Sequence, residues 1–234
     1  MNVFERSFGE QARLSREESH HLVRVLRARV GDAVNVLNGE GAVGVGRLID
    51  ASIPAIIRIE ERKQYTRPEP QITLGICIPK GKTFDSLLKK ITEIGLFDVC
   101  PLLSERTEVK LDAETSAKKA EHWEQTCIEA CKQSSNPFLP KIQKPSTLQS
   151  FLEACDADLK IVASLEPASQ PLLATLRPSK RVAMLVGPEG DFSPAEYSQI
   201  RTCGFLATSL GRNVLRVETA VVYALSVIHA ASLR

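Results

Sequence analysis

Two short glycine-containing stretches near the end of the 234-residue chain carry the residues that could do chemistry. The first, "VGPEGDFSPAE" (186–196), follows an apolar run, and its glycines let the backbone turn tightly and approach a ligand closely. The second, "LGRNVLRVETA" (210–220), puts Arg216 and Glu218 at the start of an apolar, helix-like run. Neither stretch has the glycine spacing of a P-loop or of a dinucleotide fingerprint. These residues alone are compatible with two interpretations, a ligand site or a pair of ordinary turns. In the second interpretation, Arg216 and Glu218 form a surface ion pair that stabilises the fold by roughly 0–1 kcal/mol.

Both stretches lie in a part of the chain where strand-like and helix-like runs alternate. Continuous apolar strands are expected at "ITLGICI", "FDVCPLL", "LKIVAS", "RVAMLVG" and "FLATSLG", and all of them except "LKIVAS" are followed by a helix-like run. This alternation predicts an α/β domain with a mostly parallel sheet. Each glycine stretch directly follows a strand, at the edge where α/β folds place ligands. Ser193, Pro194 and Glu196 predict a capped helix start just after the first loop. We therefore expect the two loops to lie side by side and to share one pocket.

The N-terminal part of the chain has a different pattern. "LSREESHHLVRVLRARVGD" predicts a helix that begins after Ser15, with Glu18 closing a capping box, and that ends at Gly31. The runs "AVNVLNGEGAVGVGRLID" and "IPAIIRIEE" are β-branched and joined by glycine-containing turns, which is typical of antiparallel hairpins. The polar "RKQYTRPEPQ" reads as a linker. We therefore expect a small, mostly-β domain at 1–67 and the α/β domain at 68–234.

The composition excludes several classes of protein. Hydrophobic residues make up 43% and charged residues 25% of the chain, and the net charge of +2 gives no strong field for nucleic acid, although a local basic surface stays open. The six cysteines form no C-x-x-C pair, which argues against a zinc site and a disulfide framework. No run resembles a signal peptide or a membrane span. We expect a cytoplasmic protein with no metal and no membrane partner.

The two glycine stretches, in this order and about twenty residues apart, resemble the RsmE family of the SPOUT superfamily. The stretches "HHLVRVLRARVGD", "PKGKTFDSLLKKITEIGLFDVCPLLSERTEVKL" and "IEACKQS" fit the same family along the whole chain. The resemblance implies S-adenosylmethionine-dependent methylation of uridine N3 in 16S rRNA, within the small ribosomal subunit. It also implies a SPOUT-type, trefoil-knotted methyltransferase domain preceded by a PUA-like β-barrel domain, and a homodimer with the cofactor site near its interface.

The resemblance also implies which residues form the site. The implied cofactor contacts are Leu165, Val186, Gly187, Pro188, Glu189, Gly190, Leu210, Gly211, Leu215, Arg216, Glu218, Thr219 and Ala220. Uracil N3 must lose its proton to become a nucleophile, and the resulting charge spreads onto the flanking carbonyl oxygens, where a fixed cation helps most in a dry site. We therefore expect Arg216 to stabilise that charge. Glu189 and Glu218 are the candidate proton acceptors, and a role for Glu218 in only orienting Arg216 stays open.

Basic residues outside the two loops predict the RNA contacts. Arginine and lysine on phosphates position RNA without reading its sequence, and two arginines three positions apart share one helix face. The predicted contacts are Arg24, Arg27, Lys80, Lys82 and Arg106. A solvated basic surface is the alternative. The last helix-like run, "VETAVVYALSVIHAASL", is apolar almost all round, which predicts burial either in a subunit interface or in the monomer core.

The chain departs from the family pattern at three places. Asp191 in the first loop stands where a second glycine is usual, the second loop has Arg212 and Asn213 where Pro-Arg is common and Val217 where Thr is usual, and "KQSSNPF" lacks a Cys-Gly-Arg. These departures bear on loop geometry and RNA affinity more than on the reaction class. Two alternatives stay open: a related SPOUT methyltransferase with another target, such as a ribose 2′-hydroxyl or another RNA, and a non-catalytic ribosome-assembly RNA-binding factor.

Overall fold

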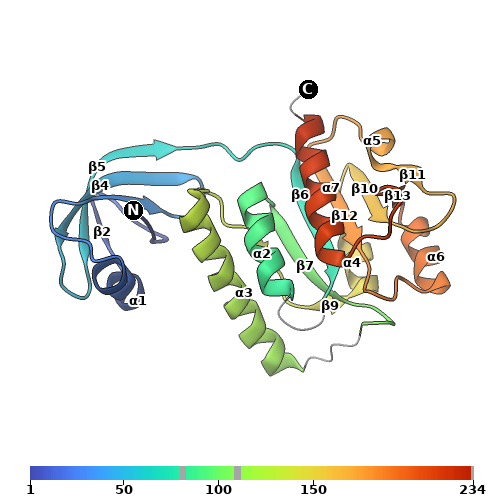
Figure 1. Cartoon of the computed structure of the whole chain (residues 1–234), viewed down its shortest axis with the longest axis horizontal. Helices are drawn as coiled ribbons and strands as arrows, with labels where there is room; N and C mark the ends of the chain where they lie inside the picture. The colour runs from blue at the N-terminus through green and yellow to red at the C-terminus, as the bar shows by residue number, and fades with distance from the viewer. Residues whose placement is uncertain (80–82, 108–111, 233–234) are drawn as a thin grey trace. The chain divides into compact units, whose positions relative to one another are not determined.

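The chain folds into two compact units. The computed structural model describes residues 1–79, 83–107 and 112–232, so the predicted RNA contacts Lys80 and Lys82 lie outside the described residues. The first unit consists of Met1–Arg67 and Ile128–Leu139, and the second of Pro68–Cys127 and Pro140–Arg234 (Figure 1). The segment Ile128–Leu139 thus belongs to the first unit, whereas the sequence pattern places it in the α/β domain.

The first unit is built on a five-stranded sheet with the order β1-β3-β4-β5-β2. Its strands are β1 (Asn2–Phe4), β2 (Gln11–Arg13), β3 (Ala33–Leu37), β4 (Ala42–Asp50) and β5 (Ile56–Gln64). The antiparallel hairpins β3–β4 and β4–β5 are confirmed, and two register shifts in the β4–β5 pair break its regular ladder, as β-bulges do. Burial alternates along β4, so one face of the strand packs on the core of this unit.

The predicted first helix is shorter than its sequence pattern indicates. Helix α1 (Arg16–His20) continues as a single π-helical turn, η1 (His21–Val25), and Arg27 then takes a left-handed φ of 57°. The chain leaves the helix here, and Ala28 enters the core with 6% of its surface exposed. The helix therefore ends about five residues before the predicted end, which is a correction to the sequence interpretation.

The capping box predicted at the start of α1 is only half formed. The side chain of Ser15 accepts a hydrogen bond from the backbone N–H of Glu18 at 3.1 Å. The Glu18 carboxylate does not return to Ser15. It accepts hydrogen bonds from the backbone N–H of Phe4 at 3.2 Å and from Nζ of Lys132 at 2.6 Å. Glu18 thus joins α1 to the segment Ile128–Leu139 of the same unit.

The second unit contains a parallel sheet with the order β11-β13-β10-β12-β6-β7-β8, and β9 also pairs with β7. Its strands are β6 (Gln71–Cys77), β7 (Asp98–Leu103), β8 (Lys141–Ile142), β9 (Ser146–Thr147), β10 (Leu159–Ala163), β11 (Gln170–Pro171), β12 (Arg181–Val186) and β13 (Leu206–Ser209). Every pairing among these strands is parallel. The predicted α/β class with a parallel sheet is confirmed, and the five expected strands are β6, β7, β10, β12 and β13.

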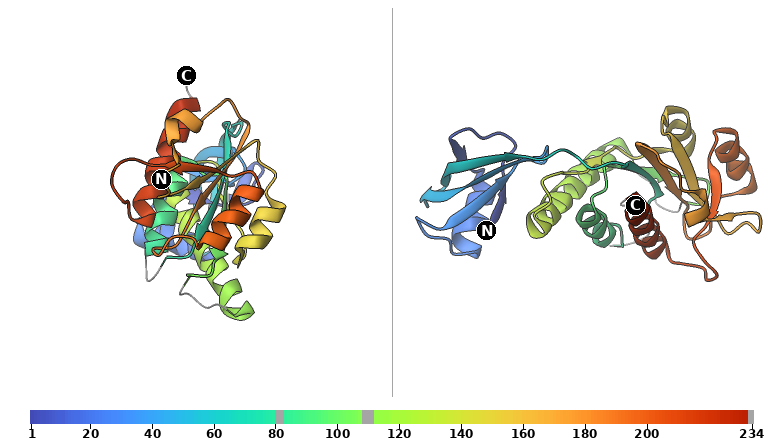
Figure 2. Two further views of the ribbon diagram at one scale, coloured as in Figure 1. Left: turned by 90° about the vertical axis from the view of Figure 1, so that its right-hand side faces the viewer. Right: turned by 90° about the horizontal axis from the view of Figure 1, so that it is seen from above.

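Helices cover both faces of this sheet. The helices of this unit are α2 (Thr83–Ile94), α4 (Leu148–Ala154), α5 (Leu172–Thr175), α6 (Pro194–Thr202) and α7 (Val217–Ser232), whereas α3 (Ala113–Ser134) begins in this unit and continues into the first unit from Ile128. Helices α2 and α7 pack together on one face, and α4 and α6 lie on the opposite face (Figures 1 and 2). Among the helices in the described part of the chain, none has both the length and the apolar character needed to cross a membrane.

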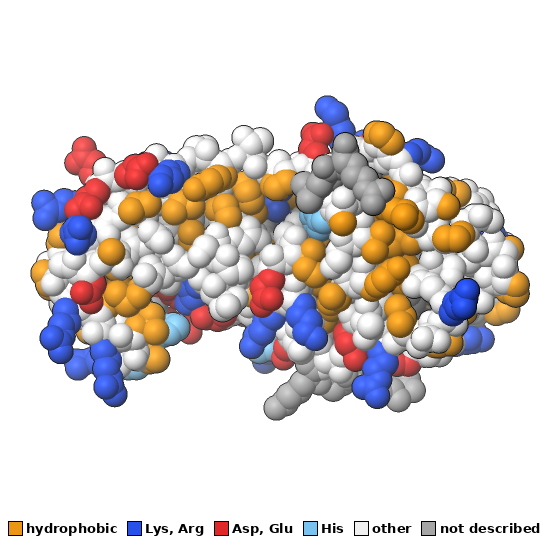
Figure 3. Space-filling model, turned by 45° about the horizontal axis from the view of Figure 1, so that its top comes forward, with side chains coloured by type: hydrophobic (Ala, Val, Ile, Leu, Met, Phe, Trp, Pro, Cys, Tyr) orange, Lys and Arg blue, Asp and Glu red, His pale blue; other side chains and the backbone are white. Residues whose placement is uncertain are grey.

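Helix α7 is only partly covered within its own unit. Its buried residues are Val217, Ala220, Val221, Ala224, Leu225 and Ile228. On another side of the helix, Tyr223 is 45% exposed, and Val222 and Val227 are half-buried. Hydrophobic side chains also gather on the surface of the second unit near the C-terminal end of the chain (Figure 3). The monomer core therefore accounts for one side of this apolar helix and leaves the other side uncovered.

Candidate functional site

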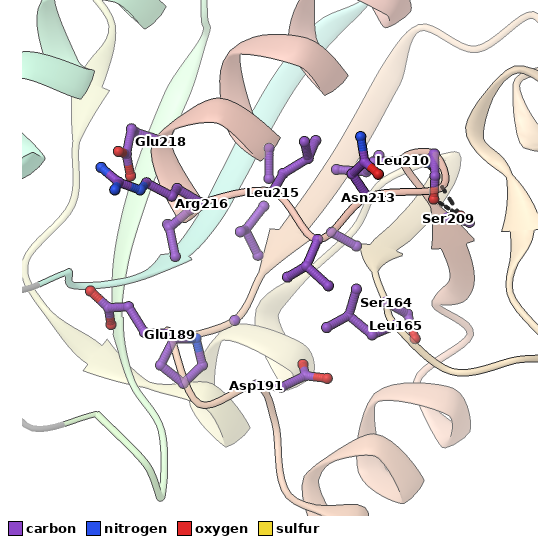
Figure 4. Close-up of a pocket in the computed structure, with 18 of the residues that line it drawn as sticks. Ser164, Leu165, Glu189, Asp191, Ser209, Leu210, Asn213, Leu215, Arg216 and Glu218 are labelled. Carbon is purple, nitrogen blue, oxygen red and sulfur yellow. Dashed lines mark hydrogen bonds between the residues drawn. The ribbon is translucent and has the colours of Figure 1, made fainter.

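Three neighbouring strands of the parallel sheet end at one cavity. Strands β13, β10 and β12 are adjacent in the sheet, and the loops that follow them supply most of the cavity wall. Figure 4 shows the two glycine stretches facing each other across it. The cavity volume is about 480 Å³, which is within the usual range for a small-molecule site. The expectation that the two loops share a pocket is therefore confirmed.

Most of the predicted site residues line this cavity. Those that do are Leu165, Val186, Gly187, Pro188, Glu189, Leu210, Gly211, Leu215, Arg216, Glu218 and Ala220. Two predicted residues do not line it: Gly190 lies beside Arg106, and Thr219 is exposed on the first turn of α7. The cavity has further lining residues that were not predicted as site residues, namely Thr83, Ala163, Ser164, Asp191, Ser209, Asn213, Val214 and Val217. All but Thr83 adjoin the predicted loops, so their sequence position is the signal that could have found them.

The first loop is a tight turn stabilised by close packing. The backbone N–H of Asp191 donates to the carbonyl of Pro188 at 2.9 Å, which closes the turn through Glu189 and Gly190. A Cβ added at Gly187 would lie 3.0 Å from the ring of Phe192, so any other residue would have to push this ring away by a few tenths of an ångström. The turn and this packing place the loop backbone at the edge of the cavity.

The helix that follows this loop is capped as predicted. Oγ of Ser193 accepts from the N–H of Glu196 at 3.3 Å, and the Glu196 carboxylate accepts from the N–H of Ser193 at 2.9 Å. The same carboxylate accepts from the N–H of Glu105 at 2.8 Å, and Nη1 of Arg106 donates to the carbonyl of Gly190 at 2.7 Å. The cap therefore also ties the loop after β7 to the glycine loop. Arg106, predicted as an RNA contact, lies next to the cavity rather than on a separate basic surface.

The second loop leads directly into α7. Gly211 has a φ of 134°, a conformation that favours glycine. The carbonyl of Arg216 accepts from the N–H of Ala220 at 2.8 Å and so makes an early backbone bond of the helix. Glu218 lies in the first turn, where the positive end of the helix dipole favours a carboxylate. The helix start thus holds Arg216 and Glu218 at the cavity.

Charged side chains gather at one end of the cavity. Glu189, Arg216 and Glu218 lie together there, with Arg216 and Glu218 extending from the start of α7 (Figure 4). Arg216 is exposed and Glu218 is half-buried. Within the described residues the two form no ion pair with each other, so the simple surface pair considered from the sequence is wrong. A cation can stabilise negative charge on a bound substrate, and a carboxylate beside it can accept a proton from the same substrate.

A third carboxylate, that of Asp191, lies farther along the cavity. Its Oδ1 accepts from the phenol of Tyr197 and from the N–H of Phe192, both at 2.8 Å. Burial, helped by the hydrogen bond to Asp191, raises the pKa of Tyr197 far above its ordinary value. The phenol therefore stays protonated and donates to Asp191 over the whole physiological pH range.

Comparison with known proteins identifies the family. The RNA methyltransferase domain family matches residues 67–229, and the RNA methyltransferase PUA domain family matches residues 14–60. The chain is 34% identical to a ribosomal RNA small subunit methyltransferase E from Synechocystis, over 93% of this chain and 72% of the relative. The chain belongs to the ribosomal RNA small subunit methyltransferase E family. A methyltransferase E of Bacillus subtilis is 28% identical, over 91% of this chain and 87% of the relative.

Solved structures of similar proteins agree with membership of the methyltransferase E family. The Neisseria gonorrhoeae methyltransferase E bound to S-adenosylmethionine superimposes with a TM-score of 0.90 at 26% identity, over 98% of this chain and 97% of that one. A Legionella pneumophila methyltransferase in complex with S-adenosylmethionine gives 0.88 at 32% identity, over 98% and 97% of the two chains. The resemblance stated from the sequence and the PUA-like assignment of the N-terminal domain are confirmed.

The structure explains one departure from the pattern of the methyltransferase E family. Asp191, where the resemblance to the family leads us to expect a glycine, has a φ of 58°. Glycine adopts this left-handed conformation freely, and aspartate tolerates it better than most side chains. The backbone shape of the loop is therefore compatible with either residue, and the substitution adds a carboxylate to the cavity.

Proposed function

We propose that this chain methylates N3 of a uridine in 16S rRNA of the small ribosomal subunit, with S-adenosylmethionine as the methyl donor. The observation that carries this proposal is the cavity at the ends of β10, β12 and β13, with Arg216 and Glu218 at one end. Membership of the methyltransferase E family supplies the reaction class. The reaction would take place in the cytoplasm, where ribosomal subunits are assembled.

The cavity fits S-adenosylmethionine in size and in lining. The backbone at Gly187 and Gly211 offers N–H and C=O groups to an adenine ring without side chains in the way. Leu165, Leu210 and Leu215 offer apolar contacts to the base, and Leu165, which is 61% exposed here, would be covered by a bound ligand. When bound, the cofactor supplies an electrophilic methyl group on its sulfonium.

The charged end of the cavity suits a uridine whose N3 must lose its proton. Arg216 would stabilise the negative charge that spreads onto the uracil carbonyl oxygens. Glu218, half-buried beside Arg216, would accept the proton, and Glu189 at the same end is the alternative acceptor. A Glu218→Gln variant that loses turnover and recovers it at alkaline pH supports Glu218 as the acceptor. A loss that is independent of pH indicates that Glu218 orients Arg216 instead.

The first unit offers a basic surface for the RNA. Arg24 and Arg27, with Arg29, are exposed around the point where η1 ends. Three apolar side chains between or beside these arginines are also exposed. The exposed fraction of the surface is 60% for Val25, 46% for Leu26 and 63% for Val30. The arginines would contact phosphates, and the apolar side chains would contact sugars and bases. Arg106 is the nearest predicted RNA contact to the cavity, and Lys80 and Lys82 stay predictions.

A homodimer is the form in which we propose that the enzyme works. The uncovered side of α7, with Tyr223 exposed, is the surface that a second copy would bury. This helix begins at the cavity, so a partner there would lie close to the site. Sedimentation of the protein with Tyr223→Arg should give a monomer where the unsubstituted protein gives a dimer. A monomer in both cases would contradict this part of the proposal.

Mass spectrometry of rRNA nucleosides tests the proposed function. In a strain lacking the gene, 3-methyluridine should disappear from 16S rRNA and should return when the gene is restored. Loss of a ribose-methylated nucleoside instead would assign a different target. No change in any nucleoside, together with no binding of S-adenosylmethionine in calorimetry, would assign the protein to RNA binding without catalysis.

A further inference from the structure

The Asp191 carboxylate lies in the cavity but has no role in the proposed reaction. It is half-buried and lines the cavity. Both hydrogen bonds that the structure gives this side chain end on one oxygen, Oδ1, from Phe192 and Tyr197. Its other oxygen, Oδ2, accepts no hydrogen bond from a residue of the described ranges. An ionised carboxylate can accept on both oxygens, so Asp191 has acceptor capacity left for a ligand.

The surroundings of Asp191 hold this carboxylate in place. Tyr197, which donates to it, is only 5% exposed, and its ring packs edge-on against Phe192 with a centroid distance of 5.7 Å. Phe192 is 3% exposed and in turn packs against the backbone of Gly187. A side chain held by buried neighbours binds a ligand group without first being ordered, which is how precise binding sites are built.

The position of Asp191 along the cavity points to one part of the cofactor. In Figure 4, Asp191 lies between the charged end, at Glu189 and Arg216, and the end formed by Ser164 and Leu165. In S-adenosylmethionine the ribose lies between the sulfonium and the base. If the reacting methyl is at the charged end, the ribose is the part that lies near Asp191.

We propose that Asp191 binds the ribose hydroxyl groups of S-adenosylmethionine through Oδ2. This inference rests on the proposed function, because it requires the cofactor to occupy the cavity. The ribose hydroxyls are hydrogen-bond donors, and a carboxylate is purely an acceptor. The same pairing of an acidic side chain with a ribose hydroxyl is used in dinucleotide-binding folds. Asp191 thus contributes to cofactor affinity and selectivity rather than to the chemical step.

Binding of S-adenosylhomocysteine, measured by calorimetry, tests the role of the carboxylate. Asp191→Asn keeps the size of the side chain and removes its charge, and the affinity should fall roughly tenfold to a hundredfold, as for a lost hydrogen bond to a charged group. Asp191→Gly adopts the φ of 58° without strain and should show a similar loss. Equal affinity of the unsubstituted protein and Asp191→Asn would overturn the inference.

Ligands that lack one part of the cofactor identify the part that Asp191 contacts. The 2′,3′-dideoxy analogue of S-adenosylhomocysteine should bind the unsubstituted protein and Asp191→Asn with the same affinity. With 5′-methylthioadenosine, which keeps the ribose and lacks the amino acid, the difference between the two proteins should persist. A difference that vanishes with 5′-methylthioadenosine would assign Asp191 to the ammonium group and overturn the ribose assignment.

Two controls separate the outcomes. Tyr197→Phe removes the hydroxyl group that donates to Asp191 but leaves the carboxylate. The affinity of this variant for S-adenosylhomocysteine should therefore fall less than that of Asp191→Gly. Thermal unfolding of each variant shows whether the loop region still folds. If the unsubstituted protein binds no S-adenosylhomocysteine, the proposed function fails. If it binds and Asp191→Asn binds equally well, only the ribose assignment fails.

Discussion

Arg216 supplies the positive charge that the proposed reaction requires. It lies at the charged end of the cavity, exposed, and forms no ion pair with Glu218 in the described part of the chain. A guanidinium free of such a pair can turn toward an incoming base. Because most of the cavity wall is loop backbone and apolar side chains, the cofactor should bind without the help of Arg216, and the cation should act on the second substrate.

Arg216→Ala should therefore lower turnover and leave cofactor affinity almost unchanged. We expect kcat to fall by about a hundredfold to a thousandfold, the usual cost of losing one group that stabilises developing charge. The dissociation constant for S-adenosylmethionine should change by less than about threefold, or roughly 0.7 kcal/mol. Arg212→Ala is the matched control, because Arg212 is exposed in the same loop and does not line the cavity. Full turnover of Arg216→Ala would remove Arg216 from the reaction.

The two loop glycines beside the cavity should respond differently to alanine. Gly211 has a φ of 134°, so Gly211→Ala strains the backbone by about 1–3 kcal/mol and should weaken S-adenosylmethionine binding measured by calorimetry. Gly190 has no such φ, and a Cβ there would lie 3.7 Å from Cδ of Arg106, an ordinary contact. Gly190→Ala should therefore bind almost normally. Equal losses in both variants would contradict this assignment of strain.

The sequence predicts the ends of the cavity better than its middle. Arg216 and Glu218 can be recognised in the sequence because charged residues at the start of an otherwise apolar helix indicate a functional site. Asp191 does not stand out, since its role depends on a left-handed φ and on the phenol of Tyr197, neither of which has a sequence signature. Thr83 comes from α2, far away in the chain, and no local pattern connects it with the loops.

At the scale of elements, long regular runs are predicted correctly and short or irregular ones are not. Strands β6, β10 and β12 lie inside the sheet and are buried, so their sequences are continuously apolar. Strands β8, β9 and β11 have two residues each, which is too short for any period. The first helix is overpredicted because Val25, Leu26 and Val30 have helical spacing, although all three are exposed.

The exposed arginines around the end of η1 should contribute to RNA affinity through their charge. Arg24→Ala and Arg27→Ala should each weaken binding of 16S rRNA and reduce the slope of log affinity against log salt by roughly 0.7–0.9. Arg47→Ala is the control in the same unit, because Arg47 already pairs with Glu60 at 3.2 Å. Filter binding at a series of salt concentrations measures the slope. A slope unchanged in the Arg24 and Arg27 variants would show that the RNA binds elsewhere.

At the scale of the molecule, one buried ion pair joins distant parts of the chain within the first unit. Nζ of Lys132 lies 2.6 Å from Glu18 and 2.7 Å from Glu129, and the side chains of Lys132 and Glu18 are only 6% and 11% exposed. Burial by itself lowers the pKa of Lys132. The hydrogen bonds to Glu129 and Glu18 together have a larger effect in the opposite direction, so the pKa of Lys132 is raised. Because the pKa of Lys132 is raised in the folded protein, the ion pair stabilises the fold at neutral pH. This stabilisation is lost only when the pH rises through the pKa of Lys132.

Breaking this ion pair should destabilise the protein. Lys132→Met leaves the Glu18 carboxylate buried without its cation and should lower the free energy of unfolding by about 3 kcal/mol. The double variant Glu18→Gln/Lys132→Met should recover part of the loss, because no buried charge is then left unpaired. Urea unfolding at pH 7 measures both. A loss below about 0.5 kcal/mol, typical of exposed pairs, would contradict this assignment. The sequence could not predict the pair, because its partners lie 114 positions apart.

The central claim is that the cavity at the ends of β10, β12 and β13 directs a methyl group to uridine N3. The most direct measurement uses purified protein, small ribosomal subunits that lack the modification, and S-adenosylmethionine with a deuterated methyl group. We expect mass spectrometry to find the label in 3-methyluridine of 16S rRNA, and we expect Arg216→Ala to reduce this label at least a hundredfold. Label in a ribose methyl group, or none with intact cofactor binding, would contradict the account.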